Sequence, residues 1–397
     1  MKIAQLTLNG YYNYGNILQK YALNRVLKRY ADEVDVLWFE EDNFLPETWE
    51  WNWRPKLISM FNSAEARRQF TFEISHQTVF KLFYDRHIST RYDISSLEDI
   101  ADDYDYFVVG SDQVWNPNFP FAERFLSFAQ KEKRIAYAAS IAIPSIPNNL
   151  KEVFRRGISE IPNISVREKE AAKIIKELTG INPIVLIDPT LMLTVEEWQK
   201  LSQKPSWFDK KYNDGYILTY FLRGEVPSLI NEEIKKLNLP VINLFDLNNF
   251  NYYTVGIEGF LFLVENASIV YTNSFHGTLF SILYERPVVV CHLAKDVAAM
   301  DMTSRIHDLL KNFKLEDREL NTKNDFHIDS PFEVDYSQKE DILKIEREKA
   351  KNFLTKAFLR HHKGGGYYNL RRQPKLKLNK LFDKRSMLFP TTDRRVA

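Results

Sequence analysis

The segment Ile269-Val-Tyr-Thr-Asn-Ser-Phe-His-Gly-Thr carries the residues best suited to chemistry on a small anion. Its apolar start predicts a buried strand, and the residues from Thr278 onward predict a helix. The turn between them places backbone N–H groups and the positive end of a helix dipole together, which favours a phosphate or carboxylate. His276 in the same turn could transfer a proton. We predict His276 as a proton donor, beside an anion site formed by Ser274 and the N–H groups of Gly277 and Thr278.

Two arginines stand at predicted helix starts, where a positive charge is unfavourable against the helix dipole. Arg167 follows a predicted strand, and Arg305 lies in the first turn of a later helix. Such positions indicate a negatively charged partner, because a guanidinium can grip a carboxylate or phosphate with two hydrogen bonds. Lys295 adds a cation in the same half as Arg305. We predict that these three cations bind the anion; for Arg167, a salt bridge to Glu168, Glu170 or another acid is the alternative.

Two other turns follow predicted strands and carry groups that could contact a sugar. The first has two asparagines, which could cap a helix or bond a hydroxyl, and a glycine that permits a tight turn. The second has a hydroxyl, a carboxylate, an amide and an indole ring that could stack on a sugar. The structural alternative is an Asx-turn followed by a packed Trp. The residues predicted on this acceptor side are Asn13, Gly15, Asn16, Ser111, Asp112, Gln113 and Trp115.

Other motifs are absent or favour structural roles. Asp188 before Pro189 is typical of an N-cap or turn anchor. Metal binding is not supported, because the chain has no H-E-x-x-H motif and a single cysteine, Cys291, predicted in a strand. A Walker A motif and the G-x-G-x-x-G dinucleotide fingerprint are also missing.

Strand-like and helix-like runs alternate along the chain, which is typical of an α/β protein with parallel sheets. We predict two Rossmann-like doubly wound domains facing a cleft, with ligands beyond the carboxyl ends of the strands. An insertion at 44–93 contains Trp49, Trp51 and Trp53, with helices expected near 63–72 and 76–86. The expected parts are an N-terminal domain at 1–203, a C-terminal domain at 213–337, a long helix at 338–359 and a tail at 360–397.

Composition restricts the class of protein further. The chain of 397 residues has a formal net charge of +1, which gives no general attraction to nucleic acid. With one cysteine, no disulfide can form within the chain, and no apolar run reaches the ~20 residues of a membrane span. The first residues predict a strand and not a signal peptide, so we expect a cytoplasmic protein. The tail holds eleven Lys or Arg against two Asp, so it could also bind anionic lipid at the inner membrane face; a disordered, solvated end is the alternative.

The ordered set of motifs resembles the polysaccharide pyruvyl transferase family. The matching pieces are Asn13-Tyr-Gly-Asn with Leu18-Gln-Lys-Tyr-Ala-Leu, Val109-Gly-Ser-Asp-Gln-Val-Trp-Asn, Ser165-Val-Arg-Glu, Asp188-Pro-Thr-Leu, Thr272-Asn-Ser-Phe-His-Gly-Thr and Ser304-Arg-Ile. The resemblance implies a GT-B-like fold, phosphoenolpyruvate as donor with no further cofactor, and a sugar of a surface polysaccharide such as exopolysaccharide or capsule as acceptor. A lipid-linked oligosaccharide is one form that this acceptor could take. On this interpretation His276 is the general acid, and Arg167 with Arg305 or Lys295 holds the donor.

Two other functions fit the same residues. A GT-B glycosyltransferase with a nucleotide-sugar donor would need a similar anion site between two Rossmann-like halves. A non-catalytic partner in glycan assembly, held at the membrane by the basic tail, would need no catalytic His276. Release of phosphate or of nucleotide from the respective donors separates these functions.

Overall fold

The structure, a computed structural model, describes residues 1–11, 13–38, 63–91, 100–119, 123–222, 226–291, 303–320 and 330–359. The chain divides into two compact units, Met1–Ala357 and Phe358–Ala397, and both sheets belong to the first. The tail at 360–397, the three alternating tryptophans and Lys295 lie outside the described residues.

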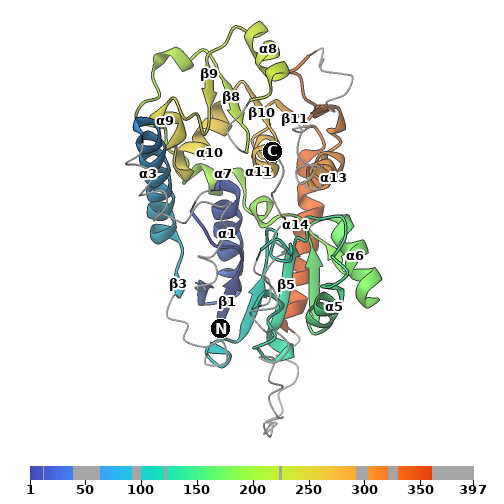
Figure 1. The fold of residues 1–397 in the computed structure, drawn as a ribbon. Coiled ribbons are helices and arrows are strands. Elements are labelled where there is room, and N and C mark those ends of the chain that lie inside the picture. The colour runs from blue at the N-terminus through green and yellow to red at the C-terminus, as the bar shows by residue number, and fades with distance from the viewer. Residues whose placement is uncertain are drawn as a thin grey trace, which may run out of the picture. The chain divides into compact units, whose positions relative to one another are not determined.

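The first sheet has seven parallel strands in the order β3-β2-β1-β4-β5-β6-β7 (Figure 1). Sheet growth reverses between β1 and β4, as in a Rossmann fold. Every residue of β4 and β5 is buried, as expected for short apolar strands covered on both faces. The strands are β1 (Lys2–Leu6), β2 (Glu33–Leu37), β3 (Thr90–Arg91), β4 (Tyr106–Val109), β5 (Arg134–Ala139), β6 (Asn163–Val166) and β7 (Ile184–Val185).

The second sheet has five parallel strands in the order β12-β11-β10-β8-β9. Its growth reverses between β8 and β10, as in flavodoxin-like sheets. The strands are β8 (Ile217–Tyr220), β9 (Val241–Asn243), β10 (Ile269–Thr272), β11 (Val288–Cys291) and β12 (Glu319–Leu320). We call each sheet with its helices a half of the protein.

Helices connect the strands of both sheets. Those of the first half are α1 (Tyr14–Leu27), α3 (Ala64–His87), α5 (Lys151–Ser159), α6 (Lys169–Thr179) and α7 (Val195–Gln199). Those that follow are α8 (Ser228–Lys236), α9 (Phe250–Tyr253), α10 (Ile257–Asn266), α11 (Phe275–Leu283), α13 (Thr303–Phe313) and α14 (Lys339–Leu359). Single 3-10 turns are η2 (Glu123–Phe125), η3 (Lys131–Lys133), η4 (Pro189–Met192), η5 (Lys210–Tyr212) and η6 (Glu316–Arg318).

The predicted α/β class with two Rossmann-like, GT-B-like halves is confirmed by these two parallel sheets. One element was predicted wrongly. Residues 64–87 form the single helix α3 instead of two helices, since no Gly or Pro interrupts them. No described helix is long and apolar enough to cross a membrane. The domain boundaries at 203 and 213 stay a prediction.

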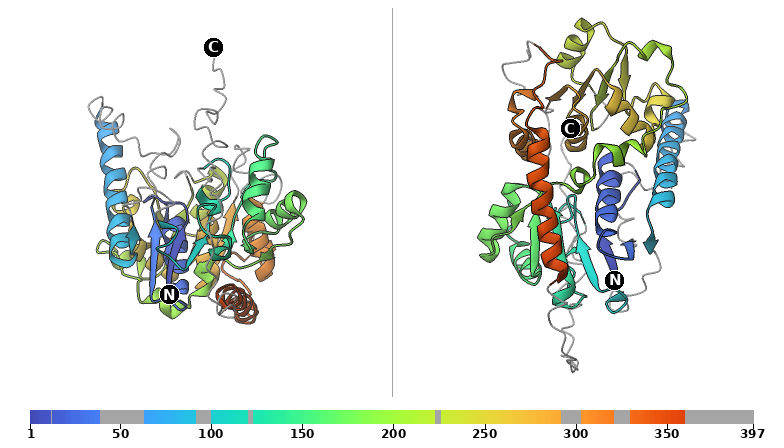
Figure 2. Two further views of the ribbon diagram at one scale, coloured as in Figure 1. Left: turned by 90° about the horizontal axis from the view of Figure 1, so that it is seen from below. Right: turned by 180° about the vertical axis from the view of Figure 1, so that it is seen from behind.

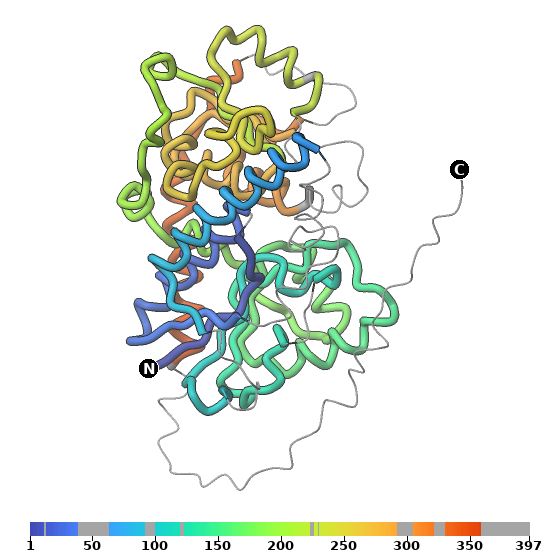
Figure 3. Tube along the Cα trace, turned by 60° about the vertical axis from the view of Figure 1, so that its left-hand side comes forward, coloured from blue at the N-terminus to red at the C-terminus, as the bar shows by residue number. Residues whose placement is uncertain are grey.

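Aromatic side chains join the two halves. The Tyr14 ring at the start of α1 stacks on Phe260 of α10 at 4.4 Å, and its hydroxyl donates to the Val255 carbonyl at 2.7 Å. Figure 3 shows α1 and α3, both blue, beside the yellow helix α10, against which both pack. The start of α1 is therefore held against the second half, which matters for the site below.

Helix α14 makes a second connection (Figure 2). At its start, Lys339 Nζ donates to the Leu283 carbonyl of the second half at 3.1 Å. Two turns later, Arg347 donates to the carbonyls of Leu191 and Leu193 at 2.7 and 2.9 Å. The helix thus links α11 to the chain segment that leaves the first sheet.

Candidate functional site

In each sheet the strand order reverses at one point, and residues that follow the strands at these two points contact each other. In parallel sheets, ligands bind beyond the carboxyl ends of strands where strand order reverses. Residues 13–16 and 111–113 follow β1 and β4 at that point of the first sheet, and His276 follows β10 at that point of the second. A methyl group on Gly15 would lie only 2.1 Å from His276 Nδ1, so α1 and the imidazole touch.

The turn before α11 is built by its own polar groups. Ser274 is the N-cap, and its Oγ accepts the Gly277 N–H at 3.3 Å. The Thr278 N–H donates to the Ser274 carbonyl at 3.0 Å. Gly277 is required because a methyl group there would lie 2.6 Å from Thr272 Oγ1. These bonds correct the expectation that the Gly277 and Thr278 N–H groups bind an anion, since both already donate within the turn.

The imidazole side chain of His276 is 9% exposed and lies between Gly15 and Asp188. Its Nδ1 faces the Gly15 backbone, and its Nε2 lies 3.6 Å from Asp188 Oδ2. That separation is too long for a hydrogen bond, and Nε2 has no hydrogen-bond partner among the described residues. Nε2 is thus a buried polar atom without a bond in that part of the chain.

Asp188 contacts several other members of the site. Its Oδ1 accepts bonds from the N–H and hydroxyl of Thr190, at 3.0 and 2.7 Å, as the N-cap of η4. Its Oδ2 accepts from Arg167 Nη1 at 2.7 Å and from Ser111 Oγ at 3.3 Å. Burial would raise the pKa of Asp188, but the charges of His276 and Arg167 outweigh it and lower that pKa well below its usual range.

Arg167 is buried directly after β6, as its position in the sequence predicted. The predicted alternative of an ion pair is present, with Asp188 at 2.7 Å and Glu168 at 3.9 Å. Burial alone would lower the pKa of Arg167, but these two acids raise it. Its Nε and Nη2 have no hydrogen-bond partner in the described part of the chain. One side of the guanidinium is thus satisfied, and the other is buried without a partner in that part of the chain.

Arg305 in the first turn of α13 lies in the same group. Its guanidinium and that of Arg167 lie 5.9 and 4.6 Å from the centre of the Phe275 ring. Arg305 is 5% exposed, and burial together with the positive charge of Arg167 lowers its pKa to about 10. Its Nε also has no partner in the described regions. A buried cation beside another cation is costly, and a bound anion would relieve that cost.

The last member of this group is Glu168, the residue immediately before α6. Its Oε1 accepts bonds from Ser140 Oγ, Ile141 N–H and Ala142 N–H, at 2.9, 2.9 and 3.2 Å. Its Oε2 has no hydrogen-bond partner in the described part of the chain. The second acid beside Arg167 is therefore held firmly by the turn after β5.

The predicted acceptor residues divide into two sets. Asn13 is the N-cap of α1, with its Oδ1 accepting the Asn16 N–H at 3.2 Å. Asn16 Nδ2 donates to Asp112 Oδ2 at 3.2 Å and to the Leu8 carbonyl at 2.9 Å. Asp112 and Gln113 are half-buried. This first set borders the His276 contact through Gly15, and the role of Gly15 is to leave room for the imidazole.

Trp115 and Ser111 form the second set, and both are fully buried. The Trp115 indole packs near Phe125 in the core, and its Nε1 donates to the Arg124 carbonyl at 3.1 Å. The expectation that this ring stacks on a sugar is wrong, since no face of it is open. Ser111 supports Asp188 instead of facing an acceptor.

Sequence reasoning missed Asp188 and Glu168 as members of the site. Asp188 was assigned only its cap, although it stands at a strand end like the other candidates. Glu168 was considered only as a partner of Arg167. Among the described residues, no group of three His, Cys, Asp or Glu side chains is placed to hold a metal ion.

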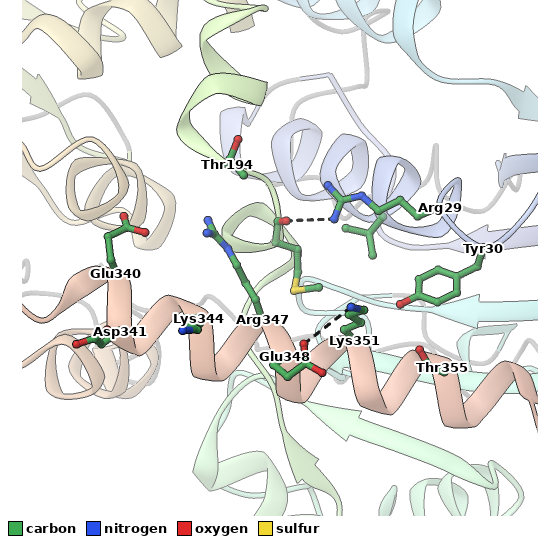
Figure 4. Close-up of a pocket in the computed structure, with 12 residues that line it drawn as sticks. Arg29, Tyr30, Thr194, Glu340, Asp341, Lys344, Arg347, Glu348, Lys351 and Thr355 are labelled. Atoms are coloured by element: carbon green, nitrogen blue, oxygen red, sulfur yellow. Dashed lines mark hydrogen bonds and ion pairs between the residues drawn. The ribbon is translucent and has the colours of Figure 1, made fainter.

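A cavity of about 740 Å³ lies elsewhere, between the end of α1 and α14 (Figure 4). Its two arginines are already held: Arg29 donates to Glu197 Oε1 at 2.9 Å, and Arg347 donates to two carbonyls. None of its lining residues belongs to the group around His276. We assign it no part in the chemistry.

The family comparison decides what kind of protein this is. The model of the polysaccharide pyruvyl transferase family matches residues 13–291, more than half of the chain. The chain belongs to the polysaccharide pyruvyl transferase family. This is a family of enzymes, and the match includes Gly15, Arg167, Asp188 and His276, whereas Arg305 lies beyond it. No curated protein sequence matches the chain.

Solved structures with a similar course of the chain are distant. UDP-GlcNAc 2-epimerase from Neisseria meningitidis bound to UDP-GlcNAc is 12% identical, with a TM-score of 0.39 over 91% of this chain and 100% of its own. The epimerase from Methanocaldococcus jannaschii is 12% identical, with a TM-score of 0.41 over 90% and 100%. UGT73P12 from Glycyrrhiza uralensis is 10% identical, with a TM-score of 0.39 over 97% and 95%. Nothing about the site is inferred from likenesses this weak.

Proposed function

We propose that the protein forms a pyruvate ketal on a sugar of a surface polysaccharide, with phosphoenolpyruvate as donor. The observation that carries this proposal is the pair of buried guanidiniums, Arg167 and Arg305, with unpartnered N–H groups beside His276. Phosphoenolpyruvate offers a carboxylate and a phosphate, and each can accept paired bonds from a guanidinium. A small donor enclosed by such residues is largely removed from water, which strengthens each charge interaction.

The balance of charge supports a donor held by specific bonds and not by a general positive field. Two arginines face Asp112, Asp188 and Glu168, which gives the five groups a formal sum of −1. Selectivity for an anion must then come from the unpaired N–H groups of the two guanidiniums. Lys295 stays a predicted third ligand, outside the described residues.

In the proposed reaction, His276 Nε2 gives its proton to C3 of the donor, which becomes a methyl group. The first sugar hydroxyl adds to C2, where positive charge develops. The second hydroxyl then adds to C2 as the bond from C2 to the phosphate oxygen breaks, and phosphate leaves with the electron pair. One hydroxyl proton restores His276 and the other leaves with phosphate, so no oxidant or reductant is needed.

The acceptor is proposed to lie on the side of Asn13, Asn16, Asp112 and Gln113. The first three of these side chains are bonded to neighbours at the start of α1 and after β4, so they offer a preformed polar edge. A sugar hydroxyl there would be near His276 through the contact with Gly15. The acceptor is proposed as a sugar of a surface polysaccharide, and a lipid-linked oligosaccharide is one form that it could take.

The test is phosphate release from phosphoenolpyruvate in the presence of acceptor. His276→Ala should abolish turnover and leave donor binding within about tenfold, because the imidazole is needed mainly in the transition state. His307→Ala is the matched control, since His307 is exposed on α13 and bonds Glu319. Unchanged turnover in His276→Ala would remove this residue from the mechanism. Nucleotide release from a UDP- or GDP-sugar would instead support the glycosyltransferase alternative.

We also propose that the basic tail brings this enzyme to the cytoplasmic membrane face. Clustered Lys and Arg gain free energy near anionic lipid, and salt screens that gain. The full chain should co-sediment with phosphatidylglycerol vesicles at low salt and not with phosphatidylcholine vesicles. A chain ending at residue 359 that still binds would contradict a role of the tail.

A further inference from the structure

One acid is placed to act on the imidazole of His276. Asp188 is the single carboxylate within ion-pair distance of that ring in the described part of the chain. The two other acids nearby, Asp112 and Glu168, form no ion pair with the ring in the same part of the chain; Asp112 accepts from Asn16 Nδ2 and the Gln113 N–H, and Glu168 is bonded by the turn after β5. An effect of carboxylate charge on His276 should therefore come mainly from Asp188.

The Asp188 carboxylate has no freedom to turn. Thr190 bonds one oxygen twice, and Arg167 and Ser111 bond the other. The imidazole is equally confined, because its opposite side touches the backbone of Gly15. A fixed negative charge thus faces a fixed Nε2 at 3.6 Å.

We propose that Asp188 is a positioning residue for His276: it stabilises the imidazolium across a gap that is too wide to bind the Nε2 proton. This inference rests on the proposed role of His276 as an acid. A carboxylate in hydrogen-bond contact would retain the proton, whereas one at 3.6 Å favours the charged ring and leaves the proton transferable.

Other charged groups around the ring act in both directions. Arg167 and Arg305 oppose the imidazolium, and Glu168 and Asp112 favour it at longer range. The proposed stabilisation is therefore the contribution of the Asp188 charge alone, which the variants below remove, and not the net balance of charges around the ring.

The direct test is an NMR titration of the eight histidines in the 15N-histidine-labelled full chain. The His276 signal is the one missing from His276→Gln. In Asp188→Asn its midpoint should move to lower pH by about one unit or more, since an opposite charge at this range shifts titration by 1–3 units. Glu168→Gln, which also removes an acid beside Arg167, should give a clearly smaller shift.

Asp188→Asn leaves the Arg167 charge buried without a partner, which can prevent folding. The double variant Asp188→Asn with Arg167→Gln removes both charges and is the second test. Because the loss of Arg167 alone should raise the midpoint of His276, its reference is the single variant Arg167→Gln, and the double variant should titrate at lower pH than that reference. An unchanged midpoint in either comparison overturns the inference.

The activity test separates this inference from the proposed function. In the wild-type enzyme, phosphate release should fall as pH rises past the loss of the imidazolium proton. In Asp188→Asn that fall should occur at lower pH, with a shift matching the NMR midpoint. A wild-type enzyme that releases no phosphate from phosphoenolpyruvate rejects the donor, whatever the titration gives, whereas an active enzyme with an unmoved profile rejects only the role of Asp188.

Discussion

Gly15→Ala is the sharpest perturbation that the site offers. Gly15 lies in the first turn of α1 without a positive φ, so the backbone itself can accept alanine. The added methyl group would lie 2.1 Å from Nδ1, 2.6 Å from Cγ and 2.8 Å from Cε1 of His276. Since non-bonded atoms settle near ~3.5 Å, the ring must move by about 1.4 Å.

That displacement has two measurable consequences. A misplacement of about 1 Å in a catalytic group can cost about 100-fold in rate, which is about 2.7 kcal/mol of transition-state stabilisation. In the folded protein, overpacking costs about 1–3 kcal/mol, against a gain of up to about 1 kcal/mol from replacing a helical glycine. We therefore expect kcat for phosphate release to fall about 100-fold, with stability unchanged or lowered by up to about 2 kcal/mol.

A double-variant cycle separates the contact from general effects of the substitution. In a His276→Ala background the clash disappears, so Gly15→Ala should then be neutral or stabilising in urea unfolding. Gly259→Ala is the control, because its methyl group would meet only side-chain atoms of Val255 and Pro205, at 3.1 and 3.4 Å. An equal cost of Gly15→Ala in both backgrounds, or full activity of the single variant, would refute the contact on which the site depends.

Three further outcomes are expected. Arg305→Ala should weaken donor binding and change the free energy of unfolding by no more than about 1 kcal/mol, because Arg305 has no ion pair in the described regions. Arg167→Ala should raise the donor KM and also destabilise the protein by about 3–5 kcal/mol, since it leaves Asp188 buried without its cation. Donor titration and urea unfolding of both variants measure these two effects, and equal stability losses would contradict the difference. The pKa of Asp188 is lowered in the folded protein, so the ionised carboxylate stabilises the fold above about pH 4, and this stabilisation is lost as the pH falls further. The free energy of unfolding, measured between about pH 5 and 2.5, should therefore fall less steeply in Asp188→Asn than in the wild type. Trp115→Phe should leave the acceptor KM unchanged and lower stability by about 1–3 kcal/mol, because the indole bonds the core and not a ligand; a raised acceptor KM at wild-type stability would reverse that assignment.

Much of the fold follows from short apolar runs between turns. Strand β4 and helix α10 are each a dense apolar segment with polar flanks, the kind of run on which the predicted α/β alternation depends. Helix α3 was divided wrongly at 73–75. Its buried face there carries Glu73, His76 and Gln77, and His76 Nδ1 bonds the Tyr253 carbonyl of the second half. Periodicity of apolar residues cannot detect a helix face that is buried through polar contacts.

The site was predictable where a single residue type was unusual for its position. Arg167 and Arg305 stood out as cations at helix starts, and both lie at the Phe275 ring. Asp188 was missed as a site residue because the sequence pattern indicates only its role as an N-cap. One oxygen of its carboxylate makes that cap, and the other oxygen lies near His276. Trp115 was misassigned because a tryptophan after a polar turn is equally compatible with a position in the core. Only the three-dimensional course of the chain shows whether its ring is buried or faces a ligand.

In the proposed mechanism, the charges of the site couple donor binding to the protonation of His276. With His276 neutral, the two arginines and three acids sum to −1, so an anionic donor gains little from net charge before it reaches the guanidinium N–H groups. With His276 protonated the sum is zero, and each negative charge of the donor then adds to the field of Asp188 in favour of the imidazolium. By linkage, the protonated enzyme must bind the donor more tightly. In that mechanism, the group that would hold the donor and the group that would protonate it reinforce each other, which gives a reason for acids and cations to be buried together at the proposed site.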